Sequence, residues 1–398
     1  MINKIELLAP AGDLERLKLT LLYGADAVYI GGQEYSLRAN ATNFSIPEIK
    51  EACSFAHKLG KKVYLTTNIV FHNEDIVGVY DYLNEVYQAG IDAFIVSDPF
   101  IINYIKEHFK EAEIHVSTQN STTNIESVKF FLKQGVKRVV LARELSKTEI
   151  QEIIVKTGMD IEVFIHGAMC TFFSGRCALS NYLTNRDSNR GGCSQVCRFH
   201  FDIDSSSKEK FTMATKDLNM AHYIKDLMEI GVKSLKIEGR MRSHYYLATV
   251  VSSYRKLIDA INNDTLSEEL IEIQEQVLSR VSNRENSTHY FFHEANGEDQ
   301  YYTGRQELSN QDYLGYVIDY DKIKKEVIVS ERNLFKLQDE VEIFMPSGKI
   351  ISFIIEHIYT EQGEELEVAR HPEEVLRIPC IEEVEKASMM RIKVVYND

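Results

Sequence analysis

The 398-residue sequence lacks several features that would place it in a specialised class of protein. It has no run of about 18 apolar residues, so we expect no membrane-spanning helix. Its first residues lack a basic segment followed by a long apolar stretch, so we expect no signal peptide and a cytoplasmic location. Its six cysteines are too few for a disulfide scaffold.

The net charge and the absence of common catalytic motifs argue against further classes of protein. The net charge of −15 argues against a general electrostatic grip on nucleic acid, although a local basic site remains compatible with it. No G-x-G-x-x-G follows an apolar strand, which disfavours a dinucleotide-binding fold. The sequence also contains no G-x-S-x-G nucleophile elbow and no H-E-x-x-H zinc helix.

A short unit recurs along the first two thirds of the chain: a helix-like stretch, a glycine, and a short apolar strand. A glycine after a helix adopts the left-handed conformation cheaply, and strands buried on both faces are expected to be apolar. Helical stretches such as 47–59 and 125–133 lie between the strands. The expected strands are 5–9, 27–30, 62–65, 92–96, 114–117, 138–141, 161–165 and 234–237. Eight such units predict an α/β fold, a (β/α)8 TIM-like barrel, with a doubly wound open sheet as the alternative.

The chain divides into a barrel and a smaller C-terminal domain. We predict the barrel over 1–262, with a cysteine-rich insertion over 166–218 that follows the seventh strand. Active-site loops of such barrels leave the C-terminal ends of the strands, so this insertion should cover the catalytic face. Residues 263–309 are expected to form a linker or cap. Alternating apolar residues in 310–398 predict a small antiparallel β-barrel domain.

Four of the six cysteines cluster in the insertion. They are spaced Cys170-x6-Cys177-x15-Cys193-x3-Cys197. Four thiolates are the usual ligands of a cuboidal iron–sulfur cluster or of a structural zinc ion. Zinc sites more often show two Cys-x2-Cys turns, so the wider spacing favours an iron–sulfur cluster. Zinc and unliganded thiols remain alternatives.

Basic and polar residues surround these cysteines in the sequence. Arg176, Arg190 and Arg198 lie in a stretch that contains one acidic residue, Asp187. They are candidates to bind a phosphate or carboxylate, or alternatively to pair with acidic residues elsewhere. Residues just after each strand should ring the barrel mouth. These are Asn68, Ser97, Asp98, Gln119, Asn120, Arg143, Glu144, His166, Glu238 and Arg240.

Four of the mouth residues are candidate catalytic residues: Arg143, His166, Glu238 and Arg240. Arg143 and Arg240 are expected to hold a dicarboxylate, because the guanidinium group suits bidentate pairing with a carboxylate. Ion pairs of these arginines with Glu144 or Glu238 are the alternative. His166 is a candidate proton donor or partner of the cysteine site, or else a histidine buried in the core.

Residues 162–180 resemble the signature of peptidase family U32, E-x-F-x-x-G-[SA]-[LIVM]-C-x4-G-x-C-x-[LIVM]-S, and meet each of its fixed positions. The length and the trailing β-domain resemble the family's tRNA hydroxylation branch. This resemblance implies a 4Fe-4S cluster on Cys170, Cys177, Cys193 and Cys197. It also implies oxygen-independent hydroxylation of tRNA to 5-hydroxyuridine at the wobble position, with prephenate as the hydroxyl donor.

Two other functions remain open. The family name suggests a collagenase-like peptidase, in which Cys170 and His166 could form a nucleophile and base. A cysteine bound to iron is a poor free nucleophile, so the two functions compete for the same atoms. The third function is an accessory scaffold that delivers sulfur or electrons to a partner protein in RNA modification.

Overall fold

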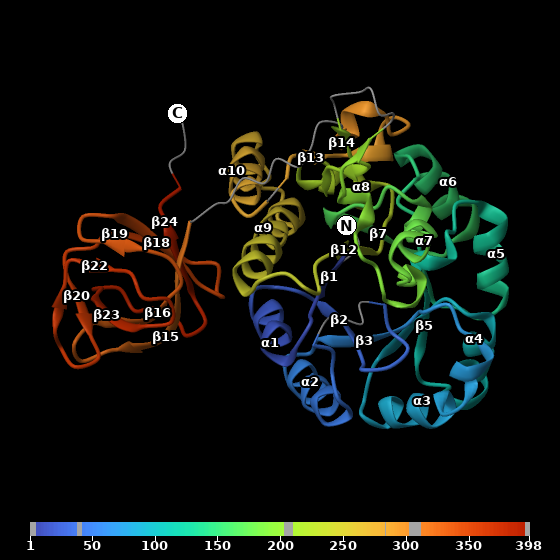
Figure 1. Cartoon of the computed structure of the whole chain (residues 1–398), viewed down its shortest axis with the longest axis horizontal. Coiled ribbons are helices and arrows are strands. Elements are labelled where there is room, and N and C mark those ends of the chain that lie inside the picture. Colours follow the sequence, from blue (N-terminus) through green and yellow to red (C-terminus); the bar gives the residue numbers. More distant parts are fainter. Residues whose placement is uncertain (1–4, 38–41, 203–209, 283, 302–311, 395–398) are drawn as a thin grey trace.

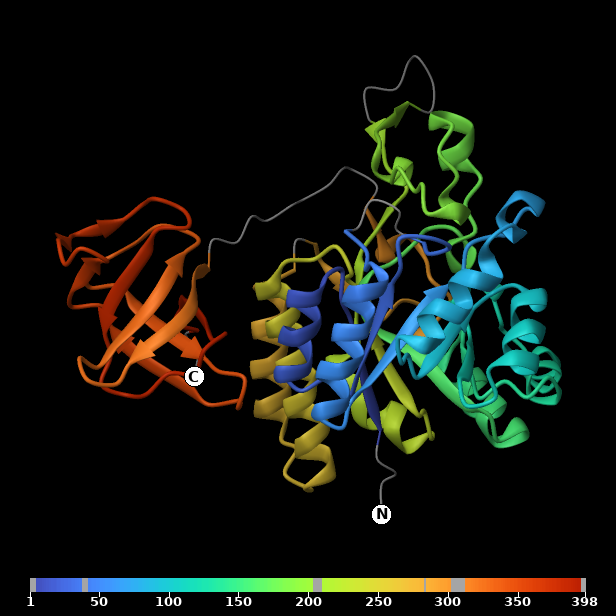
Figure 2. The ribbon, with the colours of Figure 1, turned by 90° about the horizontal axis from the view of Figure 1, so that it is seen from below.

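The computed structural model describes residues 5–37, 42–202, 210–282, 284–301 and 312–394 (Figures 1 and 2). Eight parallel strands form a closed barrel, because β12 pairs with both β1 and β7. In barrel order these are β1 (Glu6–Pro10), β2 (Ala27–Gly31), β3 (Lys62–Thr67), β4 (Ala93–Val96), β5 (Glu113–Val116), β6 (Arg138–Val140), β7 (Asp160–Ala168) and β12 (Ser234–Ile237). The predicted TIM-like barrel is confirmed.

Helices cover the outside of the barrel, and most begin and end where the sequence signals predict. They are α1 (Leu14–Leu22), α2 (Ile46–Lys58), α3 (Val79–Gln88), α4 (Pro99–His108), α5 (Ile125–Lys133), α6 (Lys147–Thr157), α8 (Ile224–Glu229) and α9 (His244–Asn262). Asp98 caps α4, and Ser146 with Glu149 forms a capping box at α6. The glycines that precede the strands have positive φ, as Gly24 (111°) and Gly158 (65°) illustrate.

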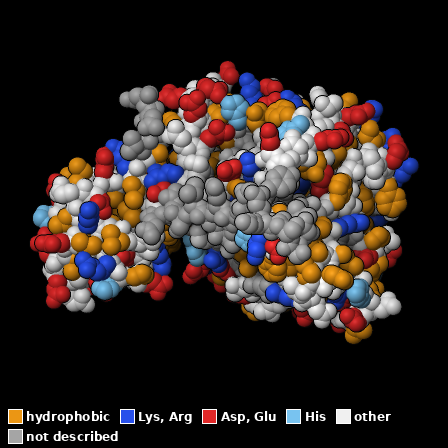
Figure 3. Space-filling view, turned by 45° about the horizontal axis from the view of Figure 1, so that its top comes forward, with side chains coloured by type: hydrophobic (Ala, Val, Ile, Leu, Met, Phe, Trp, Pro, Cys, Tyr) orange, Lys and Arg blue, Asp and Glu red, His pale blue; other side chains and the backbone are white. Residues whose placement is uncertain are grey.

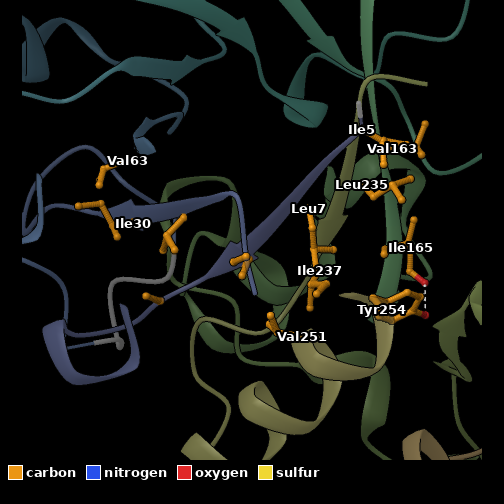
Figure 4. Packing of buried hydrophobic residues seen from close by; sticks show 14 of the residues in the cluster. Ile5, Leu7, Ile30, Val63, Val163, Ile165, Leu235, Ile237, Val251 and Tyr254 are labelled. Carbon is orange, nitrogen blue, oxygen red and sulfur yellow. Dashed lines mark hydrogen bonds between the residues drawn. The ribbon is translucent and has the colours of Figure 1, made fainter. Parts of the chain in front are cut away.

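The main core lies between the barrel strands and these helices. Alternate residues of each strand point outward, so Leu7, Leu235 and Ile237 lie in the same buried cluster as Val251 of α9 (Figure 4). The Tyr254 hydroxyl of the same helix donates to the Ile165 carbonyl oxygen at 3.1 Å. Burying this many aliphatic side chains supplies the main stabilising free energy of the barrel.

The inside of the barrel contains buried charges as well as apolar side chains. Arg138 Nη1 lies 2.5 Å from Glu6 Oε1 and 3.1 Å from Glu162 Oε2, and Lys236 Nζ lies 2.8 Å from Glu162 Oε1. Two cations and two carboxylates therefore balance within the barrel. Burial alone would raise the pKa of Glu162, but Lys236 and Arg138 lower it to about 2.

An insertion leaves the barrel after β7 and stands over the C-terminal ends of the strands (Figure 2). It contains the 3-10 helices η3 (Phe173–Gly175), η4 (Ser188–Arg190) and η5 (Val196–Arg198), the short helix α7 (Leu179–Thr184), and the strands β8 (Phe201–Asp202), β9 (Lys210–Phe211) and β10 (Ala214–Thr215). The chain returns through β11 (Asp217–Asn219), which runs antiparallel to the end of β7.

The segment predicted as a linker or cap forms one helix and two short strands that contact the barrel and the insertion. Helix α10 (Glu268–Ser279) packs on α9, and β13 (Asn286–Ser287) pairs with β11. Strand β14 (Gln300–Tyr301) pairs with β10 of the insertion. The last part of the predicted segment, 302–309, lies outside the described residues.

The C-terminal domain is an eight-stranded antiparallel sheet in the order β19-β18-β24-β15-β16-β23-β20-β21, with its own buried core. The strands are β15 (Tyr313–Asp321), β16 (Glu326–Glu331), β18 (Glu340–Phe344), β19 (Ile350–Ile354), β20 (Ile358–Thr360), β21 (Glu365–Leu366), β23 (Val375–Pro379) and β24 (Met389–Ile392). The antiparallel domain is confirmed. Its end strands β19 and β21 do not pair with each other in the described chain, so the sheet is not closed by a ladder between them.

The two domains contact each other through side chains of the barrel helices. The Tyr23 hydroxyl donates to the carbonyl oxygens of Phe344 (3.2 Å) and Ala387 (2.9 Å). The Tyr245 ring stacks on Tyr313 with 4.6 Å between the ring centroids. The β-domain thus packs beside α1, α9 and α10 (Figure 1), away from the barrel mouth. Within the described chain, no helix is both long enough and apolar enough to span a bilayer.

Candidate functional site at the barrel mouth

A pocket of about 390 Å³ opens at the C-terminal end of the barrel, between the strand ends and the insertion. All four clustered cysteines line it, together with Arg143, Arg198, Arg242 and Arg284. The pocket therefore gathers thiols and guanidinium groups in a protein of net charge −15. Two carboxylates, Glu144 and Glu238, also line the pocket, so its arginines are in excess over its acidic groups. Over the outer face seen in Figure 3, basic and acidic side chains are intermixed.

The four thiols share an environment suited to a bound group. None forms a disulfide, and they range from the buried Cys177 to the exposed Cys193. Burial raises the pKa of Cys170, and burial together with the charges of the other three thiols raises the pKa of Cys197 to about 11. The thiols thus lie close enough for their charges to interact.

Four cysteine thiols are the ligand number of either a structural zinc ion or a 4Fe-4S cluster. In the part of the chain that the structure describes, no three histidine, cysteine, aspartate or glutamate side chains converge on one metal position. A multi-iron cluster instead takes one cysteine per corner, so its ligands surround a larger group. Four free thiols lining one pocket match that requirement.

Backbone geometry holds the first two cysteines at the pocket. Ser174, between Cys170 and Cys177, has a φ of 48°, a conformation that is costly for a residue other than glycine. Glu144 stabilises this turn, because its carboxylate accepts from the Ser174 N–H at 2.5 Å and from the Ser174 hydroxyl at 2.9 Å. Glu144 is therefore a positioning residue of the cysteine loop and makes no ion pair with Arg143.

Gly167 allows the end of β7 to pass close to Glu238, the residue that follows β12. Its φ is 106°, and a Cβ there would lie 2.6 Å from the Glu238 carbonyl oxygen. Any side chain at this position would push apart the two strand ends that carry Cys170 and Glu238. Glu238 lines the pocket and accepts a hydrogen bond from the Tyr29 hydroxyl at 3.3 Å.

Arg143 is held against the pocket floor with its charge facing the cysteines. Its Nη1 donates to the Ala168 carbonyl oxygen at 2.8 Å, and its guanidinium carbon lies 3.9 Å from the centre of the Phe164 ring. No carboxylate of the described chain pairs with it. Its charge lowers the pKa of the nearby Cys170, an effect that the burial of Cys170 outweighs.

Two further arginines of the pocket lining, Arg242 and Arg284, share one carboxylate. Arg284 Nη1 lies 2.8 Å from Asp217 Oδ1, and Arg242 Nη2 lies 3.2 Å from Asp217 Oδ2. The side chains of Asp217 and Arg284 are nearly buried, at 5% and 6% exposed. Asp217 begins β11, so the return strand of the insertion positions both arginines.

The remaining predicted site residues lie at different distances from the pocket. Arg198 lines it, whereas Arg176 lines a neighbouring pocket and donates to the Gln119 carbonyl oxygen at 3.0 Å. Arg190 pairs with Asp75 at 2.5 Å and ties the insertion to the loop after β3.

Two predicted catalytic residues are buried outside the pocket lining. Arg240 is 5% exposed and donates to the Ser36 hydroxyl at 2.9 Å and to the Leu37 carbonyl oxygen at 2.8 Å. His166 is 2% exposed and bonds through Nδ1 to the Tyr254 hydroxyl at 3.1 Å. Burial, assisted by the charge of Arg242, lowers the pKa of His166 to about 3. His166 is therefore a neutral core histidine in this structure, and no described histidine lines the cysteine pocket.

The sequence-based prediction missed Arg242, Arg284 and Asp217. Arg242 lies two residues after the predicted Arg240, and it lines the pocket whereas Arg240 does not. Arg284 lies in the segment predicted as a linker, where no pattern marks it. Asp217 was included in the insertion without a role.

Comparisons with known proteins place the chain in a family. The model of peptidase family U32 matches residues 12–301, and that of the peptidase family U32 C-terminal domain matches 309–391. The chain is 44% identical over 404 residues to tRNA hydroxylation protein P1 of Bacillus subtilis, covering 98% of this chain and 95% of the relative.

Two other relatives carry different names. The 23S rRNA 5-hydroxycytidine C2501 synthase of Escherichia coli is 38% identical over 264 residues, which cover 65% of this chain and 40% of that protein. A protein of Porphyromonas gingivalis named collagenase is 32% identical over 380 residues, which cover 90% of this chain and 91% of that protein. Both family models and the extent of these matches lead to one conclusion. The chain belongs to peptidase family U32.

Proposed function

We propose that this protein is an RNA hydroxylase that carries a 4Fe-4S cluster on Cys170, Cys177, Cys193 and Cys197. The proposed substrate is tRNA, the proposed product is 5-hydroxyuridine at the wobble position, and the proposed hydroxyl donor is prephenate, a dicarboxylate. The observation that carries the proposal is the convergence of four free thiols and four arginines on one pocket at the barrel mouth.

The names of relatives support the reaction class. A relative that aligns with nearly the whole chain is named for tRNA hydroxylation, and a second is named for making a 5-hydroxylated base in rRNA. Both names describe a hydroxylation of RNA, so RNA hydroxylation is the function most consistent with the relatives.

Each residue type of the pocket has a role in this proposal. When bound, the cluster supplies electron-transfer or Lewis-acid chemistry at the pocket. Arg143 and Arg242 both line the pocket, and each could pair with one carboxylate of a dicarboxylate. Asp217 fixes Arg242, while Glu144 fixes the loop between the first two cysteines.

A cysteine peptidase is the second candidate, because one relative is named collagenase. That chemistry needs a base within hydrogen-bond reach of the thiol. The predicted base His166 is instead buried and bonded to Tyr254, and none of the described histidines lines the pocket. The geometry therefore supports the peptidase less well than the hydroxylase.

The test begins with anaerobic purification of the wild-type protein and of Cys193→Ala. We expect about four irons per chain and a broad absorption near roughly 400 nm, both lost in the variant. Cys380→Ala is the matched control, since this buried cysteine lies in the C-terminal domain, and it should keep the iron. A colourless, iron-free wild-type protein would refute the cluster.

Activity is then measured on tRNA with prephenate under anaerobic conditions. We expect nucleoside mass spectrometry to detect a uridine that has gained one oxygen atom. Thiol-sensitive cleavage of gelatin without RNA hydroxylation would favour the peptidase. Loss of the modified base in cells that lack the protein, with no activity from purified protein, would favour an accessory scaffold.

A further inference from the structure

The insertion that stands over the barrel mouth (Figure 2) carries the two most exposed aromatic side chains among the described residues. Tyr182 of α7 is 87% exposed, and Phe173 of η3 is 54% exposed. A third exposed ring, Phe199, follows η5 in the same insertion. Such rings keep a large apolar area in contact with water, so a flat partner that covers them gains free energy.

An exposed arginine without an acidic partner accompanies each of the first two rings. Arg176 lies three residues after Phe173, and its guanidinium group donates to the Gln119 carbonyl oxygen, which carries no charge. Arg186 lies four residues after Tyr182, and no carboxylate of the described residues pairs with it. The insertion therefore presents two uncompensated positive charges in a protein of net charge −15.

Both ring–arginine pairs lie in segments that begin and end at cysteines of the pocket lining. These cysteines are Cys170, Cys177 and Cys193. The Ser180 hydroxyl donates to the Arg186 carbonyl oxygen at 3.0 Å and accepts from the Ser194 N–H at 3.1 Å. The turn that carries Arg186 is thus tied to the loop of the last two cysteines, and the surface made by the two pairs borders the pocket.

We propose that this insertion surface, formed by Phe173, Arg176, Tyr182 and Arg186, binds the single-stranded part of the RNA on either side of the target nucleotide. The inference rests on the proposed RNA substrate and assigns the surface that holds it. The rings stack on unpaired bases, whose faces are covered in a duplex, and the arginines bind the phosphates between them.

The charges favour RNA over a protein partner. Leu183, beside Tyr182, is also 45% exposed, so the apolar area alone would suit either partner. A protein partner would have to bring a carboxylate to each arginine, whereas an RNA strand carries a negative charge at every nucleotide and a flat base beside it. A ring followed by an arginine, twice around one pocket, matches that repeat.

The assay measures binding without turnover. Fluorescence anisotropy compares the anaerobically purified full chain on a hairpin RNA with a seven-nucleotide, uridine-containing loop and on a blunt RNA duplex with the same number of phosphates. Tyr182→Ala and Phe173→Ala should each raise the Kd for the hairpin at least about fivefold, which is the effect of losing one stacked base, and leave the Kd for the duplex unchanged. Tyr182→Phe keeps the ring and should bind as the wild type does.

A second variant and two controls test the charges and the location. Arg186→Gln should lower the slope of log Kd against log salt concentration for the hairpin by about 0.7, the value for one phosphate contact in a single strand. Phe130→Ala is the control for the rings, because Phe130 is 52% exposed on α5 at the side of the barrel. Arg370→Gln is the control for the arginine, because Arg370 is exposed in the C-terminal domain. Both controls should bind as the wild type does.

The possible results separate this inference from the proposed function. Unchanged hairpin affinity in both alanine variants would overturn the inference, even if the protein hydroxylates tRNA, and would assign the rings to another partner such as a protein. An equal loss on the duplex, an equal loss in the controls, or no detectable hairpin binding by the wild type would also overturn it. A loss confined to the hairpin and to the insertion variants would support it even without hydroxylation, and the proposed function would then fail alone.

Discussion

Replacing Asp217 with asparagine should test how the arginine wall of the cysteine pocket is built. The carboxylate accepts from Arg284 at 2.8 Å and from Arg242 at 3.2 Å. Asparagine has nearly the same shape but no charge and one oxygen, so its amide group would face one of the two guanidinium groups. The nearly buried Arg284 would then lack a counter-charge.

The size of the effect follows from these contacts. Hydrogen bonds to charged groups contribute about 1.5–3 kcal/mol each, against about 0.5–1.5 kcal/mol between neutral groups. Weakening two of them costs about 2–3 kcal/mol, and breaking a buried ion pair costs about 3–5 kcal/mol. We therefore expect Asp217→Asn to lower the free energy of unfolding of the barrel by about 3 kcal/mol. We also expect it to raise the KM for the dicarboxylate.

The control is Asp226→Asn, which removes the ion pair between Asp226 and Lys147. Those side chains are 33% and 34% exposed, and exposed pairs contribute about 0–1 kcal/mol. Urea denaturation followed by circular dichroism would compare the barrel transition of both variants with that of the wild type. A cost for Asp217→Asn no larger than for the control would refute the idea that Asp217 holds the two arginines.

Three other changes test separate parts of the mouth and the barrel. Arg143→Lys should raise the KM for the dicarboxylate about tenfold without loss of iron. The reason is that a lysine ammonium group cannot stack on Phe164 and at the same time form two parallel hydrogen bonds with a carboxylate, as the guanidinium group can. His166→Gln should leave the pH–rate profile between pH 6 and 8 unchanged, since burial keeps the pKa of His166 near 3, and a shifted profile would contradict this. Glu162 has a folded pKa lowered to about 2, so its contribution to stability is complete above its unfolded pKa of about 4.3 and is lost as the pH falls towards 2. Glu162→Gln should therefore flatten the dependence of the unfolding free energy on pH across that window.

The barrel could be predicted from the sequence because its signals are local. Each unit ends its helix with a glycine such as Gly24 or Gly158 and continues into a short apolar strand, and both glycines adopt the expected positive φ. Helix α5 runs from Ile125 to Lys133, the stretch predicted for it. In contrast, the sequence of the linker indicates partly helical structure but not where it packs, because the contact of α10 with α9 and the pairing of β13 with β11 join distant segments.

The site could be predicted only in part, because the sequence gives the order of residues along the chain but not the direction in which each side chain points. The positions after the strands were expected at the mouth, and Arg143 and Glu238 do line the pocket. Arg240 and Arg242 are two residues apart, yet Arg240 is buried against Ser36 and Leu37 while Arg242 lines the cysteine pocket. His166 points towards Tyr254 in the core, since β7 changes register against β12 at this level. No periodicity reveals such a change.

The family name and the names of the hydroxylating relatives lead to different uses of the same cysteines. A peptidase needs one reactive thiol beside a base, whereas a cluster needs several thiols spread around a cavity. Here four thiols line one pocket that no described histidine enters, and four arginines surround them. This arrangement suits a bound inorganic group with an anionic co-substrate beside it.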